Sequence, residues 1–160
     1  MPNARSCCRS LTWLGCLIVL VVLAVPGTAS AQGFGARAGV SADPDQFYFG
    51  AHFETPPLVD RLTFRPNLEL GVGDSLTLVT VNFEFAYKIP IPRQSWTVYV
   101  GGGPAAVIQK HDQAHGGDTD VLGGLNFLLG IEERHGLMFE VKAGVIDSPG
   151  FKFGVGYTWR

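Results

Sequence analysis

The chain has 160 residues, which is enough for one domain of ordinary size. Its net charge is −2 and only 16% of its residues are charged, so it has no basic surplus to neutralise phosphates, which argues against nucleic-acid binding. Hydrophobic residues make up 46% of the chain and glycine accounts for 21 residues. This composition argues against disorder and favours many short strands with turns over a helical bundle.

The first 31 residues are typical of a cleaved export signal. Arg5 and Arg9 form a positive start, residues 11–25 are an apolar run, and residues 29–31 have the small-x-small pattern of a signal-peptidase site. An uncleaved membrane anchor is the alternative, but this run is shorter than the roughly 20 apolar residues that a spanning helix needs. We therefore expect two parts, a signal peptide at 1–31 and a mature domain at 32–160.

Removal of this leader changes the chemistry of the chain. All three cysteines, Cys7, Cys8 and Cys16, lie in it, so the exported domain has neither disulfides nor thiolate chemistry. Cys16 follows Leu14-Gly15 as in a lipoprotein signal, but most of the apolar run comes after it, which argues against lipidation. The two basic residues of the leader also leave, so that ten basic residues remain against 14 acidic ones.

The mature domain divides into eight segments in which apolar and polar residues alternate, the period of a β-strand with two different faces. In the second segment Phe47, Phe49 and Phe53 share one face, while His52 and Glu54 lie on the other. Glycine and proline interrupt every candidate helix. The predicted strands are 33–41, 46–55, 62–73, 76–88, 96–110, 121–132, 137–147 and 151–160.

Two positions predict irregular strand pairing. Pro66 has no N–H for the sheet, so its strand needs a bulge or a locally broken pairing there. A phase slip of the alternation at Leu78 and Val79 indicates a second bulge.

An even number of antiparallel strands joined by short connections can close on itself, which removes the exposed sheet edges. The sequence therefore predicts an all-β fold, a closed eight-stranded antiparallel up-and-down transmembrane β-barrel. A two-sheet sandwich is the alternative, but it would need longer crossover connections than the sequence offers.

Alternation alone does not say which face points into the barrel. An apolar interior would make a soluble, lipocalin-like lipid carrier, whereas an apolar exterior would make a membrane barrel. The polar face carries five residues of each sign, which suits an enclosed interior because a buried charge needs a partner. Glycines on the same face would leave room for these long side chains. The predicted lumen charge network is Arg37, Glu54, Arg65, Glu69, Glu84, Lys88, Glu132, Glu140, Lys142 and Lys152.

Strand length and the composition of the two ends also favour a membrane barrel. About ten residues per strand, at ~3.3 Å rise and ~40° tilt, span roughly 25 Å, the height of the apolar band in such barrels. If the first strand rises outward, seven of the eight aspartates lie on or beside the outer loops, whereas Arg61, Arg93 and Arg134 lie on the inner turns. The longest loop, around His115, is also outer, as this class expects.

The C-terminal segment from Lys152 to Trp159 contains a polar residue, a glycine two positions later and two aromatic residues at alternate positions near its end. This pattern resembles the β-signal of Gram-negative outer-membrane barrels, whose last strand is recognised by the barrel-assembly machinery. With eight predicted strands and an export signal, the whole mature chain resembles the small eight-stranded barrels of that family. The resemblance implies an outer-membrane location and makes Lys152, Gly154, Tyr157 and Trp159 the recognised positions. Arg160 follows the aromatic residue on which the family usually ends.

Little in the sequence indicates catalysis. Side chains fill the interior of an eight-stranded barrel, so a porin function is not expected. The serines lie in no G-x-S-x-G motif and in no His-activated pair, which argues against a rim-located lipid A-modifying enzyme. His52 is expected in the lumen network. His111 and His115, with neighbouring Asp112, Asp118 and Asp120, have the chemistry to chelate a divalent cation, but a solvated loop is the simpler interpretation.

We therefore expect an integral outer-membrane barrel with a structural, envelope-stabilising or surface-interaction role and a lumen plugged by paired charges. The expected partners are outer-membrane lipids and, during biogenesis, the barrel-assembly machinery. No nucleic acid, cofactor, metal or catalytic residue is expected, and the chain is expected to be a monomer. A soluble periplasmic lipid carrier and a lipid A-modifying enzyme are the alternatives.

Overall fold

The structure, a computed structural model, describes residues 33–73, 76–111 and 119–160. The predicted signal peptide at 1–31 lies outside the described residues, as do Asp112, His115 and Asp118 of the candidate cation-binding loop. No helix in the described part of the chain is long and apolar enough to cross a membrane.

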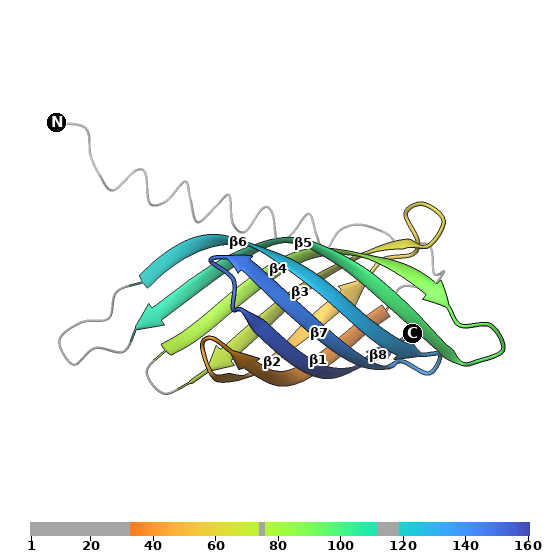
Figure 1. Ribbon diagram of the computed structural model, residues 1–160, viewed down its shortest axis with the longest axis horizontal. Coiled ribbons are helices and arrows are strands. Elements are labelled where there is room, and N and C mark those ends of the chain that lie inside the picture. Colours follow the sequence, from red (N-terminus) through yellow and green to blue (C-terminus); the bar gives the residue numbers. More distant parts are fainter. Residues whose placement is uncertain (1–32, 74–75, 112–118) are drawn as a thin grey trace. The chain divides into compact units, whose positions relative to one another are not determined.

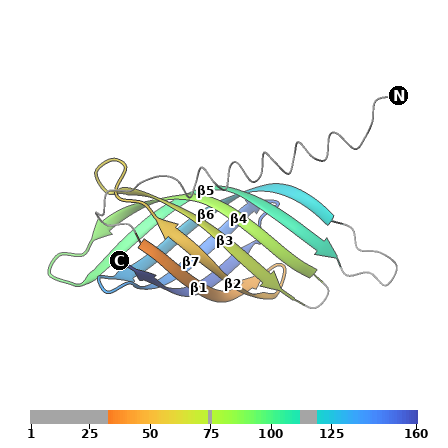
Figure 2. The ribbon, with the colours of Figure 1, turned by 180° about the vertical axis from the view of Figure 1, so that it is seen from behind.

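Eight strands form one antiparallel sheet in which each strand pairs with its neighbours in sequence and the first also pairs with the last. The prediction of a closed eight-stranded up-and-down barrel is therefore confirmed, and Figures 1 and 2 show the strands running obliquely around it. The predicted boundaries differ from the observed ones by at most two residues. The strands are β1 (Gly33–Ala42), β2 (Gln46–Glu54), β3 (Leu62–Val72), β4 (Leu76–Pro90), β5 (Trp96–His111), β6 (Thr119–Glu133), β7 (Leu137–Ile146) and β8 (Phe151–Trp159).

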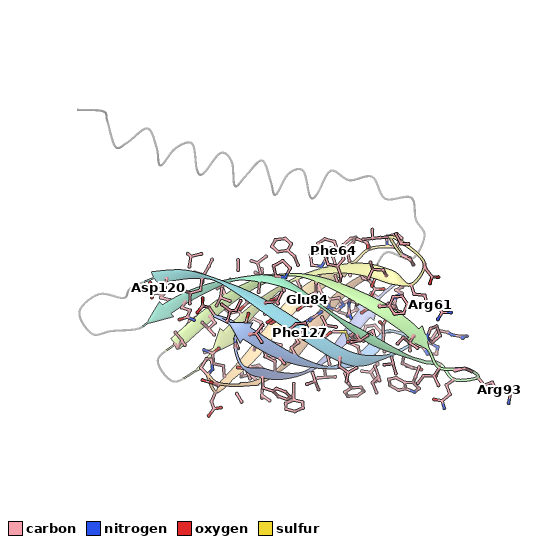
Figure 3. All side chains as sticks on the ribbon, turned by 45° about the horizontal axis from the view of Figure 1, so that its top comes forward. Arg61, Phe64, Glu84, Arg93, Asp120 and Phe127 are labelled. Carbon is pink, nitrogen blue, oxygen red and sulfur yellow. The ribbon has the colours of Figure 1, made fainter. Side chains whose placement is uncertain are left out.

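The two faces of the barrel wall differ sharply in polarity. Phe47, Phe49 and Phe53 of β2 are exposed on the outside, while Tyr48 and His52 of the same strand are buried inside. Because side chains alternate along a strand, the same division continues around the barrel. Figure 3 shows it directly, with aromatic side chains projecting outward around the wall. The described interior is lined mainly by charged and polar groups, the opposite of what a lipocalin-like cavity for an apolar ligand requires.

Pro66 breaks the pairing between β2 and β3, as its missing N–H predicts. The regular register of these strands ends at His52 opposite Asn67, the residue next to the proline in β3. Beyond it the Thr55 N–H donates to the Phe64 carbonyl at 3.0 Å, and the Phe64 N–H donates to the Thr55 hydroxyl at 3.1 Å. The side-chain hydroxyl thus replaces part of the lost ladder.

The predicted bulge at Leu78 and Val79 is wrong. The register between β3 and β4 runs without a shift through these residues, with Leu70 opposite Val79 and Gly71 opposite Leu78. The apparent slip arose because Leu78 is an apolar residue on the inner face, where it is 2% exposed. The alternation of directions is intact, and only the alternation of polarity fails at this position.

The two ends of the barrel carry opposite charges. One end holds the turns between β2 and β3, β4 and β5, and β6 and β7, with Arg61, Arg93 and Arg134 exposed on them. The other end holds exposed aspartates, among them Asp45, Asp120 and Asp147. In Figure 3 the labelled Arg61 and Arg93 lie at one end and Asp120 at the other.

Candidate functional site: the charged lumen

All ten residues of the predicted lumen network lie on the inner face of the wall. Nine of them are buried, and the side chain of Lys88 is partly exposed. They come from every strand except β5, whose inward positions carry Tyr99, glycine, alanine and other uncharged residues. Each of the ten takes part in at least one ion pair.

Glu69 of β3 is the centre of one group of contacts. Its two oxygens lie 2.8 Å from the Lys142 ammonium and 2.7 Å from the Lys152 ammonium, and 3.5 Å separates it from Arg37. Three cations from β7, β8 and β1 therefore meet on one carboxylate. All four side chains are almost fully buried, so the charges compensate one another in a region where water does not.

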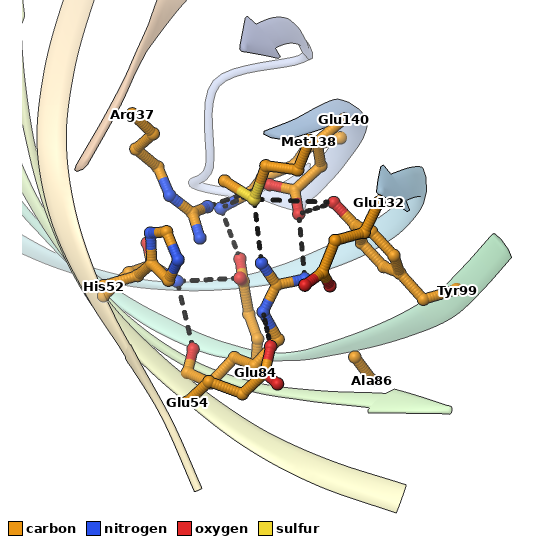
Figure 4. Close-up of polar contacts among 12 residues, drawn as sticks. Arg37, His52, Glu54, Glu84, Ala86, Tyr99, Glu132, Met138 and Glu140 are labelled. Atoms are coloured by element: carbon orange, nitrogen blue, oxygen red, sulfur yellow. Dashed lines mark hydrogen bonds and ion pairs between the residues drawn. The ribbon is translucent and has the colours of Figure 1, made fainter. Parts of the chain in front are cut away.

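Glu140 of β7 joins the same group from the opposite side of the lumen. One of its oxygens lies 2.8 Å from Arg37 Nη1, and the other accepts a 2.9 Å hydrogen bond from the Tyr99 hydroxyl. Glu84 of β4 completes the group, 2.7 Å from the Lys142 ammonium. Figure 4 labels Arg37, Glu84, Tyr99 and Glu140, whose side chains point into the lumen from different strands. The central cluster is defined as Arg37, Glu69, Glu84, Glu140, Lys142 and Lys152.

A second group lies at the basic end of the barrel. The Lys88 ammonium is 2.6 Å from Glu54 and 3.1 Å from Glu132. Arg160 pairs with the same two carboxylates, 3.2 Å from Glu54 and in contact with Glu132. The rim cluster is defined as these four residues. Arg160 was not part of the predicted network, although the alternation of β8 places it on the polar face.

Arg65 connects the two clusters. Its Nε lies 3.5 Å from Glu54 of the rim cluster, and its Nη1 lies 3.7 Å from Glu140 of the central cluster. The guanidinium also lies over the ring of Tyr99, 4.6 Å from the ring centre, a cation–π contact. Its Nη2 donates to the sulfur of Met138 at 3.0 Å. The charged groups therefore form one connected network along the described lumen.

A line of three asparagines extends this network and was missed by sequence reasoning. Asn126 donates to Asn82 at 2.7 Å, Asn82 donates to Asn67 at 2.6 Å, and Asn67 donates to Glu84 at 2.7 Å. The line crosses from β6 over β5, where the small side chain of Ala105 is opposite Asn82 in the register. The alternation of polar and apolar residues could have found them, since all three asparagines lie on the predicted polar face.

His52 lies in the lumen, as expected, but its partner is not an acid. Its Nε2 is 2.9 Å from the Thr158 hydroxyl of β8, and β1 lies between the two strands. The ring covers Gly35 of β1, where a methyl group would clash with it. Gly154 plays the same part for Tyr48, whose hydroxyl occupies the position that a β-carbon there would need. Missing side chains on the wall thus make room for large ones that cross the lumen.

The four residues of the predicted assembly signal divide between the two faces of β8. Lys152 is buried and paired with Glu69, and Gly154 lies on the same inner face. Tyr157 and Trp159 are exposed on the outside, with their ring centres 5.4 Å apart.

The lumen network combines charges of both signs from opposite walls of the barrel. The network contains five carboxylates and, with Arg160, six cations, and its side chains cross the lumen from opposite walls. Among the described residues no group of three or more histidines, cysteines or acids could hold a metal ion. Of the candidate cation-binding residues that are described, Asp120 is exposed.

The fold is that of the small outer-membrane barrels. The chain is similar to the N-terminal β-barrel domain of Pseudomonas aeruginosa OprF, with a TM-score of 0.63 and 12% identity over 80% of this chain and 96% of that one. It is also similar to Neisserial surface protein A (NspA), with a TM-score of 0.62 and 10% identity over 79% of this chain and 94% of that one. No protein-family model and no curated protein sequence matches the chain.

Proposed function

We propose that the protein is an integral outer-membrane barrel with a structural, envelope-stabilising or surface-interaction role. The reversed polarity of the wall carries this proposal. Phe127 and Phe153 are 56% and 54% exposed, whereas Arg65 and Glu69 are 1% exposed. An apolar band of this extent is unstable in water. Lipid covers it favourably, because a closed barrel pairs its backbone groups within the sheet.

We further propose that the paired charges plug the lumen. Long side chains from facing strands meet inside the barrel, as with Glu69 of β3 and Lys142 of β7 at 2.8 Å. A diffusion path would have to separate such pairs in a region of low dielectric, which is unfavourable. In planar lipid bilayers the purified protein is expected to give no large, steady conductance. Stable channels of porin size would contradict the plug while leaving the membrane location intact.

The contacts of the candidate nucleophiles and bases support a role without catalysis. The Ser41 hydroxyl donates to the carbonyl of Pro44 at 2.8 Å, and His52 contacts Thr158. The partner of Ser41 in this contact is a carbonyl and not a base, and the pair of His52 and the Thr158 hydroxyl is buried inside the lumen, at 2% and 1% exposure, away from a lipid substrate. An unchanged mass of lipid A in cells that overproduce the protein is the expected result, and a mass shift abolished in a His111→Ala variant would contradict this part of the proposal.

The proposed orientation follows from the charges at the two ends. We place the aspartate-rich end at the cell surface and the end with Arg61, Arg93 and Arg134 in the periplasm, after export by the signal at 1–31. The strand β8 would then present Tyr157 and Trp159 to the barrel-assembly machinery. A mature protein that begins at Gln32, measured by intact mass, is the expected product of cleavage.

The membrane location is tested by fractionation of a Gram-negative host that produces the full chain. We expect the protein in the outer-membrane fraction and a shift of its migration on gels between unheated and boiled samples. The same extraction applied to a variant with Phe127→Asp and Phe153→Asp, which breaks the apolar band, is expected to lose the shift. Recovery of the unaltered protein in the soluble periplasmic fraction would exclude the proposal.

A further inference from the structure

One stretch of β6 at the acidic end of the barrel is paired on one side only. The strand pairs with β5 from Thr119 onward, but its pairing with β7 begins at Gly124, which lies opposite Ile146. Figure 1 shows β6 extending past the arrowhead of β7. Residues 119–123, the open edge, therefore have no strand beside them on the β7 side within the described part of the chain. An unpaired strand edge is a template for another strand.

The backbone groups that face outward at the open edge belong to Thr119, Val121 and Gly123. Farther along β6, the Asn126 carbonyl points toward β5, because it is the atom nearest to the position that a β-carbon at Gly102 would take. Backbone N–H and C=O groups alternate in direction along an antiparallel strand, and the register from 119 to 126 is continuous. Even-numbered residues of β6 therefore bond to β5, and the odd-numbered ones point to the open side.

The chain leaves this side uncovered because β7 turns away. Ile146 has a φ of 63°, in the left-handed region, which ends the strand. The Gly144 N–H then donates to the Gly150 carbonyl at 3.1 Å, so the following residues fold back toward β8. Val121 is 72% exposed, and a β-carbon at Gly123 would have no described atom within 4 Å. An extended chain can reach the open edge without displacing a described residue.

A cavity of about 380 Å³ adjoins the open edge where β7 would have continued. Its inner lining includes Leu122 of the open edge and Leu78, which is buried. Its rim includes the exposed Asp43 and Asp147. No lysine, arginine or histidine is among the described residues that line it. This cavity, the mouth pocket, combines an apolar floor with an acidic rim.

We propose that the open edge and the mouth pocket bind an extended polypeptide segment in which basic and apolar residues alternate. The segment adds a strand to the sheet, since its backbone supplies the N–H and C=O groups that the open edge lacks. Directly opposite residues of paired strands point to the same face, so the residue opposite Leu122 points into the mouth pocket. A lysine or arginine there lays its apolar stem on Leu122 and Leu78 and brings its charge to Asp147. The residue opposite Gly123 faces outward, where the missing side chain leaves room for an apolar one.

The occupant is a segment of another polypeptide and not a second copy in the same membrane. Two identical edges that pair antiparallel are related by a two-fold axis perpendicular to the barrel wall, and this axis would turn one barrel upside down in the membrane. An axis along the strand would tilt one barrel by twice the tilt of the strand. A segment that arrives from solution meets neither restriction. The proposal rests on the proposed surface-interaction role and on the placement of the acidic end at the cell surface.

Binding is tested with the full-length protein inserted into phosphatidylcholine vesicles and with a labelled synthetic peptide of alternating valine and lysine. Fluorescence anisotropy is expected to show saturable binding that vesicles without protein do not give. The same peptide with N-methyl groups on its backbone is expected to bind about tenfold more weakly or less, because it cannot donate to the open edge. A peptide of alternating valine and glutamate is also expected to bind more weakly. Equal binding of the methylated peptide overturns strand addition, and equal binding of the glutamate peptide overturns the charge assignment.

Two proline variants test the open edge from the side of the protein. Val121→Pro removes an N–H that points to the open side, so the barrel is expected to keep its heat-dependent gel shift while the affinity for the lysine peptide falls about tenfold. Gly123→Pro acts in the same way and serves if Val121→Pro fails to fold. Unchanged affinity in a folded proline variant overturns the proposal. A dimer of the unaltered protein that a proline variant loses would assign the open edge to a second copy and overturn it as well.

The mouth pocket is tested by Asp147→Asn, which is expected to weaken binding of the lysine peptide several-fold. Asp45→Asn is the matched control, since Asp45 is exposed at the same end and does not line the mouth pocket. Equal effects of the two variants overturn the role of the pocket. Failure of the unaltered protein to insert into vesicles is a different result, because it contradicts the proposed membrane location itself.

Discussion

The central cluster and the rim cluster use the same chemistry at different depths. Glu69 and Lys142 in the central cluster have side chains 1% and 2% exposed. In the rim cluster, Lys88 is 19% and Arg160 is 27% exposed. A fully buried ion that loses its partner is destabilised by several kcal/mol, whereas water solvates a partly exposed one. Ion pairs of similar length therefore differ in their contribution to stability, and the difference depends on how deeply the charged groups are buried in the lumen.

The largest expected effect is that of Glu69→Ala. The change removes the carboxylate that Lys142, Lys152 and Arg37 share, and leaves three cations buried. We expect the free energy of unfolding to fall by about 3–5 kcal/mol. Urea titration in lipid vesicles, followed by tryptophan fluorescence, measures it. Glu133→Ala is the control, since Glu133 lies outside both clusters, and a loss no larger than that of the control would show that the central cluster is as solvated as the rim.

Phe83→Arg tests whether the outer face of the wall that encloses both clusters meets lipid. Phe83 is exposed on the outside of β4, next to the inward Glu84. An arginine on the lipid face near the midplane is expected to lower the free energy of unfolding in vesicles by about 2–4 kcal/mol. Phe83→Leu keeps the site apolar and is expected to change it much less. If arginine is tolerated as well as leucine, this face does not meet lipid.

Glu84→Gln sharpens the comparison within the central cluster. The substitution removes the ion pair with Lys142 but keeps an oxygen that accepts from Asn67. Because Lys142 retains Glu69 at 2.8 Å, we expect a smaller loss of about 1–3 kcal/mol in the same titration. A loss equal to that of Glu69→Ala would mean that shared partners do not compensate one another.

Arg160→Gln is expected to have the smallest effect. Glu54 and Glu132 keep Lys88 as a partner, and the rim is open to water, so the loss should be about 1 kcal/mol or less. Salt should reduce it further, since screening acts on partly exposed charges more than on buried ones. Unfolding measured at low and high salt checks both points. A large and salt-independent loss of stability would show that the rim cluster is shielded from water as the central cluster is.

Alternation was sufficient to predict the fold because an antiparallel strand with two different faces has a simple period. It failed at Leu78, where the lumen near the acidic end of the barrel takes an apolar side chain, so that the polarity of the residue no longer shows which way it points. It succeeded at Pro66 because the loss of an N–H is a property of the residue itself and independent of its surroundings.

The partners within the lumen were beyond prediction for a geometrical reason. The alternation along a strand tells whether a side chain points into the lumen or outward. Its position along the barrel axis depends on how far each strand is staggered against the next. Arg37 and Glu140 are 103 positions apart and meet only because that stagger brings them to one level. The line of Asn67, Asn82 and Asn126 depends on the same stagger across three strand pairs, so each residue alone looks like any polar group on the inner face.

Every buried acid in the described lumen is a glutamate, and no aspartate is buried there. A glutamate carries its carboxylate one methylene farther from the wall than an aspartate does. The inner radius of the barrel therefore determines which of the two acids can reach a partner. Exchanging Glu69 for aspartate would conserve charge and yet draw the carboxylate back from its ammonium partners. Electroneutrality alone does not describe this interior, because each acid must also be long enough to reach across it.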